Sequence, residues 1–215
     1  GEGDDIVDGG DGDDLIIGGN GAGDDYYKGG DGIDTVKYTS ATDGITVNLT
    51  TGTATSTNGG DAAGIGTDTL TEIENIISGN FDDILTGSSV SNTIQGIAGS
   101  DLINAAGGDD TIILTGNSSY EGLSAHNVGS SSDVATNIKL DLTGKVKLET
   151  VVDGGADADI VNLSSNGDAF FLHDSFSGFH SSLTLTTDTH TGAQSTQRIL
   201  NVETINGLGG DDIID

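Results

Sequence analysis

Residues 69–113 read TLTEIENII, SGNFDDILT, GSSVSNTIQ, GIAGSDLIN and AAGGDDTII, which are five consecutive units of nine residues. Each unit has an acidic residue or an asparagine at its sixth position and an isoleucine or a leucine at its eighth. Successive side chains of a strand point to opposite faces, so each unit predicts a short strand with one inward apolar side chain. The aliphatic ladder predicts the buried core of a repetitive, coiled fold. Its members are Ile76, Leu85, Ile94, Ile103 and Ile112.

The same unit recurs on both sides of this stretch. Residues 9–17 (GGDGDDLII) and 29–37 (GGDGIDTVK) fit the pattern G-G-x-G-x-D-x-U-x, in which U is a large apolar residue. An 11-residue version, GGNGAGDDYYK, lies between them, and shorter runs of the unit begin at residues 154 and 198. The sequence therefore predicts four repeat blocks, at residues 1–37, 69–113, 154–171 and 198–215.

Three segments without the period separate the blocks, at residues 38–68, 114–153 and 172–197. Alternating stretches at residues 45–49 and 138–142 predict ordinary half-buried strands within the first two. Helical periodicity is weak and proline is absent. We expect one all-β domain over residues 1–215, a parallel β-roll or β-solenoid with these segments as strand and loop decorations. Because the sequence opens in the middle of a unit and lacks an initial methionine, we expect it to be a piece of a larger protein.

The charge balance narrows the possible partners. Lys and Arg total 6 against 35 Asp and Glu, which gives a formal charge of -29. Such a surface repels nucleic acid and anionic membranes, and no apolar run is long enough for membrane insertion. Cysteine is absent, so neither disulfides nor thiolate metal sites are available. Many of the acids lie beside the 36 glycines, and acidic turns are sites for hard cations.

The spacing of the unit suits calcium in particular. Glycines allow the backbone conformations that turn several carbonyl oxygens toward one point, and the sixth-position acid adds negative charge there. Calcium accepts 6 to 8 oxygen ligands in loose geometry, so we expect several calcium ions as cofactors and calcium-dependent folding. The candidate ligands are the sixth-position residues Asp5, Asp14, Asp25, Asp34, Asp83, Asn92, Asp101, Asp110, Asp159, Asp168 and Asp212.

Stacking predicts which ligands share an ion. Two units make one coil, so Asp83 and Asp101, which lie two units apart, should flank one calcium ion. Asn92 and Asp110 should lie on the opposite side, and their site should be weaker because Asn92 carries no charge. In the first block Asp14 pairs with Asp34 and Asp5 with Asp25, at a longer spacing because the 11-residue unit lengthens the coil.

The nonapeptides resemble the RTX (repeats-in-toxin) calcium-binding repeats of secreted bacterial toxins, proteases, epimerases and large adhesins. This resemblance implies a calcium-binding β-roll outside the cell or on the bacterial cell surface. The stretches VDGGADADIVNLSSNGDAFFLHDSFSGFHSSLTL, from residue 152, and RILNVETINGLGGDDIID, from residue 198, also resemble the peptide-binding module of long bacterial RTX adhesins. That resemblance implies capture of the C-terminal end of a peptide on host or microbial cells, with roles in adhesion and biofilm formation.

One aromatic cluster stands out in a chain that has few aromatic residues. Four of the five phenylalanines lie between residues 170 and 179, and the cluster is equally compatible with a local core and with the wall of a binding site. The polar residues around it are the candidate contacts to a peptide, with calcium as a bridge to its carboxylate. They are Asp153, Asp157, Asn166, His173 and Asp174.

Catalytic motifs are missing from the sequence. It contains no G-x-S-x-G, P-loop, dinucleotide or H-E-x-x-H pattern, so we do not expect an enzyme. Two alternatives to the peptide-binding module stay open. One is a structural or secretion-promoting calcium roll with no ligand other than calcium, and the other is a calcium-dependent carbohydrate-binding module.

Overall fold

The computed structural model describes residues 2–19, 21–99, 101–117, 151–162, 169–170, 199–208 and 213–214. Every regular element in these residues is a β-strand. No segment among them forms a helix that is long and apolar enough to cross a bilayer.

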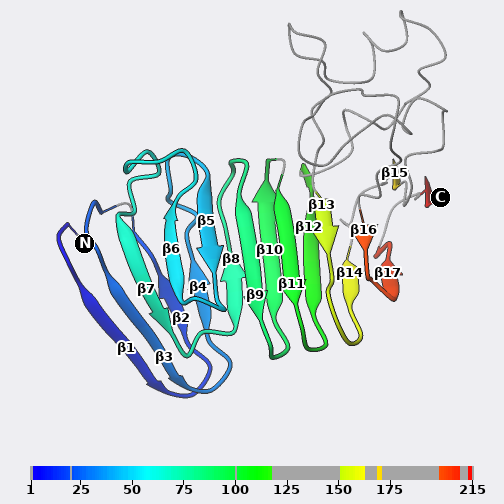
Figure 1. The fold of residues 1–215 in the computed structure, drawn as a ribbon, viewed down its shortest axis with the longest axis horizontal. Helices are drawn as coiled ribbons and strands as arrows, with labels where there is room; N and C mark the ends of the chain where they lie inside the picture. Colours follow the sequence, from blue (N-terminus) through cyan, green and yellow to red (C-terminus); the bar gives the residue numbers. More distant parts are fainter. Residues whose placement is uncertain are drawn as a thin grey trace, which may run out of the picture.

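Most of the strands belong to two sheets that the chain visits alternately (Figure 1). Sheet A contains, in spatial order, β1 (Ile6–Asp11), β3 (Tyr26–Asp31), β7 (Thr67–Thr71), β6 (Thr53–Ser56), β5 (Ile45–Asn48), β9 (Ile84–Ser88), β11 (Leu102–Ala106), β13 (Val151–Asp153) and β16 (Ile199–Leu200). Sheet B contains β2 (Leu15–Ile17), β4 (Thr35–Lys37), β8 (Asn75–Ile77), β10 (Thr93–Ala98), β12 (Thr111–Asn117), β14 (Ile160–Asn162) and β17 (Thr204–Asn206). A separate parallel pair joins β15 (Ala169–Phe170) to β18 (Ile213–Ile214).

Each coil of the roll contributes one strand to each sheet, and consecutive coils pair in parallel. Leu85 of β9 lies opposite Ile103 of β11, and Ile94 of β10 lies opposite Ile112 of β12, so each coil comprises two repeat units. In the first block, β1 pairs with β3 and β2 with β4 at the longer spacing expected from the lengthened unit. The predicted all-β parallel roll and its register are therefore confirmed.

The eighth-position residues form the core between the sheets. Ile76, Leu85, Ile94, Ile103 and Ile112 are all 0% exposed, as the spacing predicts. Val36, Val152 and Val161 continue the same ladder in other coils and are equally buried. Leu102, the neighbour of Ile103 on the outer face, is 47% exposed. Burial of the eighth-position residue of each repeat unit thus sets the register of the coils.

The strands within residues 38–68 form part of sheet A and are not a surface decoration. The strand predicted at residues 45–49 is present as β5, but β5 and β6 form an antiparallel hairpin that lies inside sheet A, between β7 and β9. Ile45, Val47 and Ala54 point inward and are 0% exposed, so burial of these side chains draws the hairpin into the sheet.

The hairpin makes the two sheets unequal. Between β7 and β9 sheet A holds two extra strands, whereas in sheet B the matching strands β8 and β10 pair directly. Two strands occupy about 10 Å along a sheet, so the roll bends at this point. Figure 1 shows β1, β3 and β7 inclined to β9–β12.

The coil also resumes earlier than the predicted boundary at residue 154. β13 pairs with β11 in sheet A, and its Val152 is 0% exposed. Sequence reasoning placed residues 151–153 in an insertion because Thr150, at the sixth position of this unit, is not acidic. The strand predicted at residues 138–142 lies outside the described residues.

Truncating one rung of the core ladder should destabilise the roll. We expect Ile103→Ala to lower the free energy of unfolding by about 2–5 kcal/mol, because it leaves a cavity between the sheets. Leu102→Ala removes the same kind of side chain from the outer face of the same strand and should cost within about 0.5 kcal/mol. Urea unfolding of both variants in saturating calcium measures the difference. Equal losses would contradict the inward assignment of Ile103.

Candidate functional site

The sixth-position side chains stack in two columns, one at each edge of the roll. Residues that directly precede sheet B strands form one column, and residues that precede sheet A strands or lie in their first two positions form the other. The sheet-B column contains Asp14, Asp34, Glu74, Asn92, Asp110, Asp159 and Glu203. The sheet-A column contains Asp5, Asp25, Asp68, Asp83 and Asp101.

One carboxylate oxygen of each pair bonds to the neighbouring coil. The backbone N–H of Asp14 donates to Oδ1 of Asp34 at 2.7 Å, and the N–H of Asp110 donates to Oδ1 of Asp159 at 2.9 Å. A return bond runs from the N–H of Thr35 to the carbonyl of Asp14 at 2.9 Å. Each carboxylate therefore replaces a backbone acceptor and ties two coils together.

The predicted pairs lie side by side in this arrangement. The sixth-position N–H of one coil donates to Oδ1 of its partner in three further pairs: Asp5 to Asp25 at 2.8 Å, Asp83 to Asp101 at 3.1 Å, and Asn92 to Asp110 at 2.7 Å. The relative strength of the sites at Asp83 and Asn92 stays a prediction.

The residues of the two columns differ in the hydrogen-bond partner of their second carboxylate oxygen, Oδ2. Oδ2 of Asp14, Asp34, Asp110 and Asp159 is buried and has no hydrogen-bond partner in the protein. Three of these residues, Asp34, Asp110 and Asp159, are at most 1% exposed. A buried carboxylate oxygen without a partner is strongly unfavourable unless a cation compensates its charge.

Glycine at the first position of the unit keeps space free beside this oxygen. A Cβ atom on Gly9 would lie 2.6 Å from Oδ2 of Asp14 and 2.6 Å from the carbonyl oxygen of Gly29 in the next coil. A Cβ atom on Gly29 would clash in the same way with Oδ2 of Asp34 and the carbonyl oxygen of Glu72. Each space is thus bordered by carboxylate and carbonyl oxygens and would be filled by any side chain.

These donors fit a hard cation. Within the described residues, no three His, Cys, Asp or Glu side chains converge on one point, so backbone carbonyls have to complete a coordination shell. The turn before Asp34 provides for this, because Gly30 and Gly32 have φ angles of 116° and 152° and expose their peptide groups. A shell of oxygen atoms only, from carboxylates and carbonyls, matches calcium.

Electrostatics in the sheet-B column point the same way. Burial, together with the neighbouring carboxylates of Asp159 and Asp109, raises the pKa of Asp110 to about 7. Burial also raises the pKa of Asp159, with Glu203 and Asp109 acting in the same direction. The column therefore carries crowded negative charge that a bound cation would offset.

Other predicted ligands have both side-chain atoms engaged by the protein. Oδ1 of Asp83 accepts from the N–H of Ile45 at 2.9 Å, and Oδ2 accepts from the N–H of Gly79 at 3.3 Å. Oδ1 of Asn92 accepts from the N–H of Ser88 at 2.7 Å, and Nδ2 of Asn92 donates to the carbonyl of Glu74 at 2.6 Å. The structure thus uses Asp83 and Asn92 as hydrogen-bonding residues.

Asp68 is a member of the sheet-A column that sequence reasoning missed. It is 1% exposed, and its Oδ1 accepts from the N–H of Asp25 at 3.1 Å. The signal was present, since Asp68 is followed two residues later by the buried Leu70. It was overlooked because the hairpin interrupts the nine-residue count before it.

The candidate peptide contacts are only partly described. Oδ1 of Asp153 accepts from Nδ2 of Asn201 at 2.7 Å, on the outer face of sheet A. Asp157 lies exposed in the turn after β13, has a φ angle of 81°, and accepts from the N–H of Gly108 at 3.3 Å. The structure does not bring the two carboxylates into contact. The predicted residues outside the described parts are Asn166, Asp168, His173, Asp174 and Asp212.

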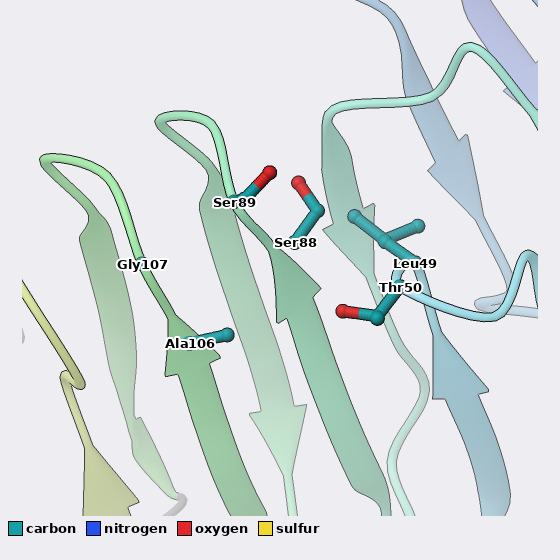
Figure 2. Close-up of a pocket in the computed structure, with 6 residues that line it drawn as sticks. All are labelled: Leu49, Thr50, Ser88, Ser89, Ala106 and Gly107. Carbon is teal, nitrogen blue, oxygen red and sulfur yellow. The ribbon is translucent and has the colours of Figure 1, made fainter.

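A hollow of about 510 Å³ lies at the edge of the roll where the hairpin turn replaces a repeat turn. Figure 2 shows that its lining comes from three neighbouring turns, after β5, β9 and β11. Oγ1 of Thr50 donates to the carbonyl of Gly87 at 2.9 Å and fixes the hairpin turn against the next coil. The lining residues are Leu49, Thr50, Ser88, Ser89, Ala106 and Gly107.

Comparison with known families identifies the repeats. Four copies of the RTX calcium-binding nonapeptide repeat match residues 1–36 and 76–113. No curated protein matches the chain. The chain therefore contains RTX repeats, which bind calcium ions, and the predicted cofactor is confirmed.

Calcium-free folding should improve as the pH falls. The pKa of Asp110 rises from 3.8 in the unfolded chain to about 7 in the calcium-free fold. Protonation therefore stabilises this fold fully below about pH 4, and that stability is lost as the pH rises through about 7. We expect more strand signal in circular dichroism at about pH 5 than at about pH 8 in excess chelator.

Saturating calcium provides the control, because a bound cation holds the carboxylates ionised and should remove most of this pH dependence. A calcium-free chain with the same strand signal at both pH values would show that buried carboxylates do not oppose its folding.

Proposed function

We propose that calcium ions bind along the sheet-B column, between the turns of consecutive coils. Asp14, Asp34, Asp110 and Asp159 supply the carboxylate ligands, and carbonyl oxygens of the glycine-rich turns complete the shell. The single observation that carries this assignment is the buried Oδ2 atom of these residues, which has no partner in the protein. Asp168 and Asp212 are the corresponding candidates in the last blocks.

Calcium binding makes folding of the roll depend on the calcium concentration around it. A chain with a formal charge of -29 opposes its own compaction, and ions placed between coils remove that repulsion where it is strongest. Such oxygen-only sites fill at the calcium concentrations outside cells and empty in the cytosol. RTX repeats are typical of proteins that bacteria secrete, in agreement with an extracellular location. The chain would then fold after export.

Removing one open carboxylate should weaken calcium-dependent folding. We expect Asp110→Asn to raise the calcium concentration at half-folding by about tenfold or more, because it removes a charged ligand. Asn92→Ala, one coil earlier in the same column, loses an engaged amide and should change this midpoint far less, although it lowers stability in saturating calcium. Calcium titrations followed by circular dichroism measure both. Equal midpoints in the two variants would contradict the assignment.

We further propose that the roll carries a peptide-binding adhesion module of a bacterial RTX adhesin. Support comes from the resemblance of residues 152–185 and 198–215 to such modules. Support also comes from the described coils, in which Asp153 and Asp157 occupy β13 and the turn that follows. The partner would be the C-terminal end of a peptide on a host or microbial surface, and RTX repeats are generally non-enzymatic.

The negative charge of the chain affects how it can bind the carboxylate of a peptide C-terminus. An anionic ligand is repelled by the acidic chain unless a bound cation reverses the field locally. A calcium ion with an open coordination position does this for a terminal carboxylate, while Asn166, His173 and Asp174 contact the rest of the peptide beside the Phe170 to Phe179 cluster. Peptide binding therefore depends on calcium in this proposal.

Amidation of the peptide tests carboxylate capture. A peptide selected for binding in calcium should lose at least about tenfold in affinity when its C-terminus is amidated, because one charge-assisted contact is removed. Calorimetry with the protein held in saturating calcium measures both forms, and chelator provides the negative control. Unchanged affinity after amidation would contradict the proposal. Binding of glycans only would favour a carbohydrate-binding module, and no saturable ligand besides calcium would favour a structural or secretion-promoting roll.

A further inference from the structure

Two acids of the sheet-A column, Asp25 and Asp68, have no open oxygen. Oδ1 of Asp25 accepts from the N–H of Asp5 at 2.8 Å, and Oδ2 accepts from the hydroxyl of Tyr27 at 2.5 Å. Oδ1 of Asp68 accepts from the N–H of Asp25 at 3.1 Å, and Oδ2 accepts from the hydroxyl of Tyr38 at 2.7 Å. In the sheet-B column of the first two coils, Oδ2 of Asp14 and Asp34 lacks such a donor.

Both tyrosines reach these carboxylates from inside the roll. Tyr27 is 3% exposed and occupies the eighth position of its unit, where the other repeats carry an aliphatic or phenylalanine side chain. Tyr38 is 0% exposed and directly follows β4. A core residue and a turn residue thus both aim a hydroxyl group at the sheet-A column.

The ring of Tyr38 also fills the space that other turns leave free. Gly18 is the first residue of its repeat unit, and a Cβ atom added to it would clash with the ring of Tyr38. In the sheet-B column the equivalent Gly29 instead borders the open Oδ2 of Asp34. At Gly29 this space borders an open carboxylate, whereas at Gly18 the ring of Tyr38 occupies it.

We infer that the hydroxyl groups of Tyr27 and Tyr38 take the place of calcium at Asp25 and Asp68, so that these coils bind calcium at one edge only. The inference rests on the proposed calcium sites of the sheet-B column. A hydroxyl–carboxylate bond is charge-assisted and satisfies the buried oxygen that would otherwise need a cation. A calcium ion at Asp25 would displace the hydroxyl of Tyr27 and leave it without a partner in the core. This inference departs from the prediction that Asp25 is a calcium ligand.

The Tyr38–Asp68 bond has a second role. These two residues are the first and last of the segment 38–68, which contains the hairpin β5–β6. Their side chains meet across 30 residues of sequence and close the base of the segment without a metal ion. At the sheet-A edge of the first coils this hydrogen bond therefore stays formed at calcium concentrations too low to fill the proposed sites of the sheet-B column.

A matched pair of variants in the whole chain tests the inference by calcium calorimetry. Asp34→Asn and Asp25→Asn change the same position of adjacent units, on opposite edges. Asp34→Asn should lower the number of calcium ions bound per chain by at least one, whereas Asp25→Asn should bind as many as the unaltered chain, with affinity within about twofold. Loss of an ion in Asp25→Asn would overturn the inference. Retention of every ion in Asp34→Asn would instead overturn the proposed sheet-B sites.

Removal of the hydroxyl group alone provides a milder test if Asp25→Asn fails to fold. Tyr27→Phe opens Oδ2 of Asp25, so the variant should bind no fewer calcium ions than the unaltered chain. At calcium concentrations that just fill the sheet-B sites it should melt about 2–6 °C lower, because the carboxylate loses its donor. Tyr26→Phe is the control, since Tyr26 is adjacent and 37% exposed. A Tyr27→Phe chain that melts with Tyr26→Phe, or that binds fewer ions, would overturn the inference.

Discussion

The roll depends on the bond between a sixth-position carboxylate and the backbone N–H of the neighbouring coil. This bond places an acid inside the protein at many of the turns, for example Asp34 beside Asp14 and Asp159 beside Asp110. The bond satisfies the Oδ1 atom of the acid. The Oδ2 atom then needs a partner of its own, because a buried charge has to be compensated. The chemistry of each edge follows from the partner that the second oxygen finds.

Three kinds of partner occur along the described parts of the two columns. Backbone N–H groups complete Asp83, tyrosine hydroxyls complete Asp25 and Asp68, and the oxygens of Asp34, Asp110 and Asp159 stay open to a cation. The same sequence position therefore has different chemistry in different coils. Side chains elsewhere decide which applies, since Tyr38 reaches Asp68 from 30 residues away. The repeat motif therefore identifies candidate calcium ligands, and the contacts that each acid makes in the fold determine whether it is available to bind calcium.

The sequence predicted those features that the unit itself encodes. The register of Leu85 with Ile103 follows from an apolar residue at every eighth position, since any slip would expose the whole ladder. β13 was missed because Thr150 lacks the acid that marks the unit, although Val152 keeps the inward position. The alternating pattern of residues 45–49 predicted a strand but not its neighbours, because alternation does not distinguish a strand within a large sheet from a surface hairpin. The Tyr38–Asp68 bond joins residues 30 apart and carries no local pattern, whereas Tyr27 lies only two residues after Asp25, at a position that the unit pattern marks as apolar core.

The hairpin β5–β6 also has a mechanical consequence. Strands pair along the long axis of the roll, so the bonds between strands lie along that axis, in series from coil to coil. Sheet B joins β8 directly to β10, whereas sheet A reaches from β7 to β9 through two more strands. Tension along the axis would straighten the bend and load the shorter sheet first. The hydrogen bonds between β8 and β10 would then carry most of the force, while sheet A, which is longer at this point, carries less. A chain of such coils under tension would therefore separate first between β8 and β10.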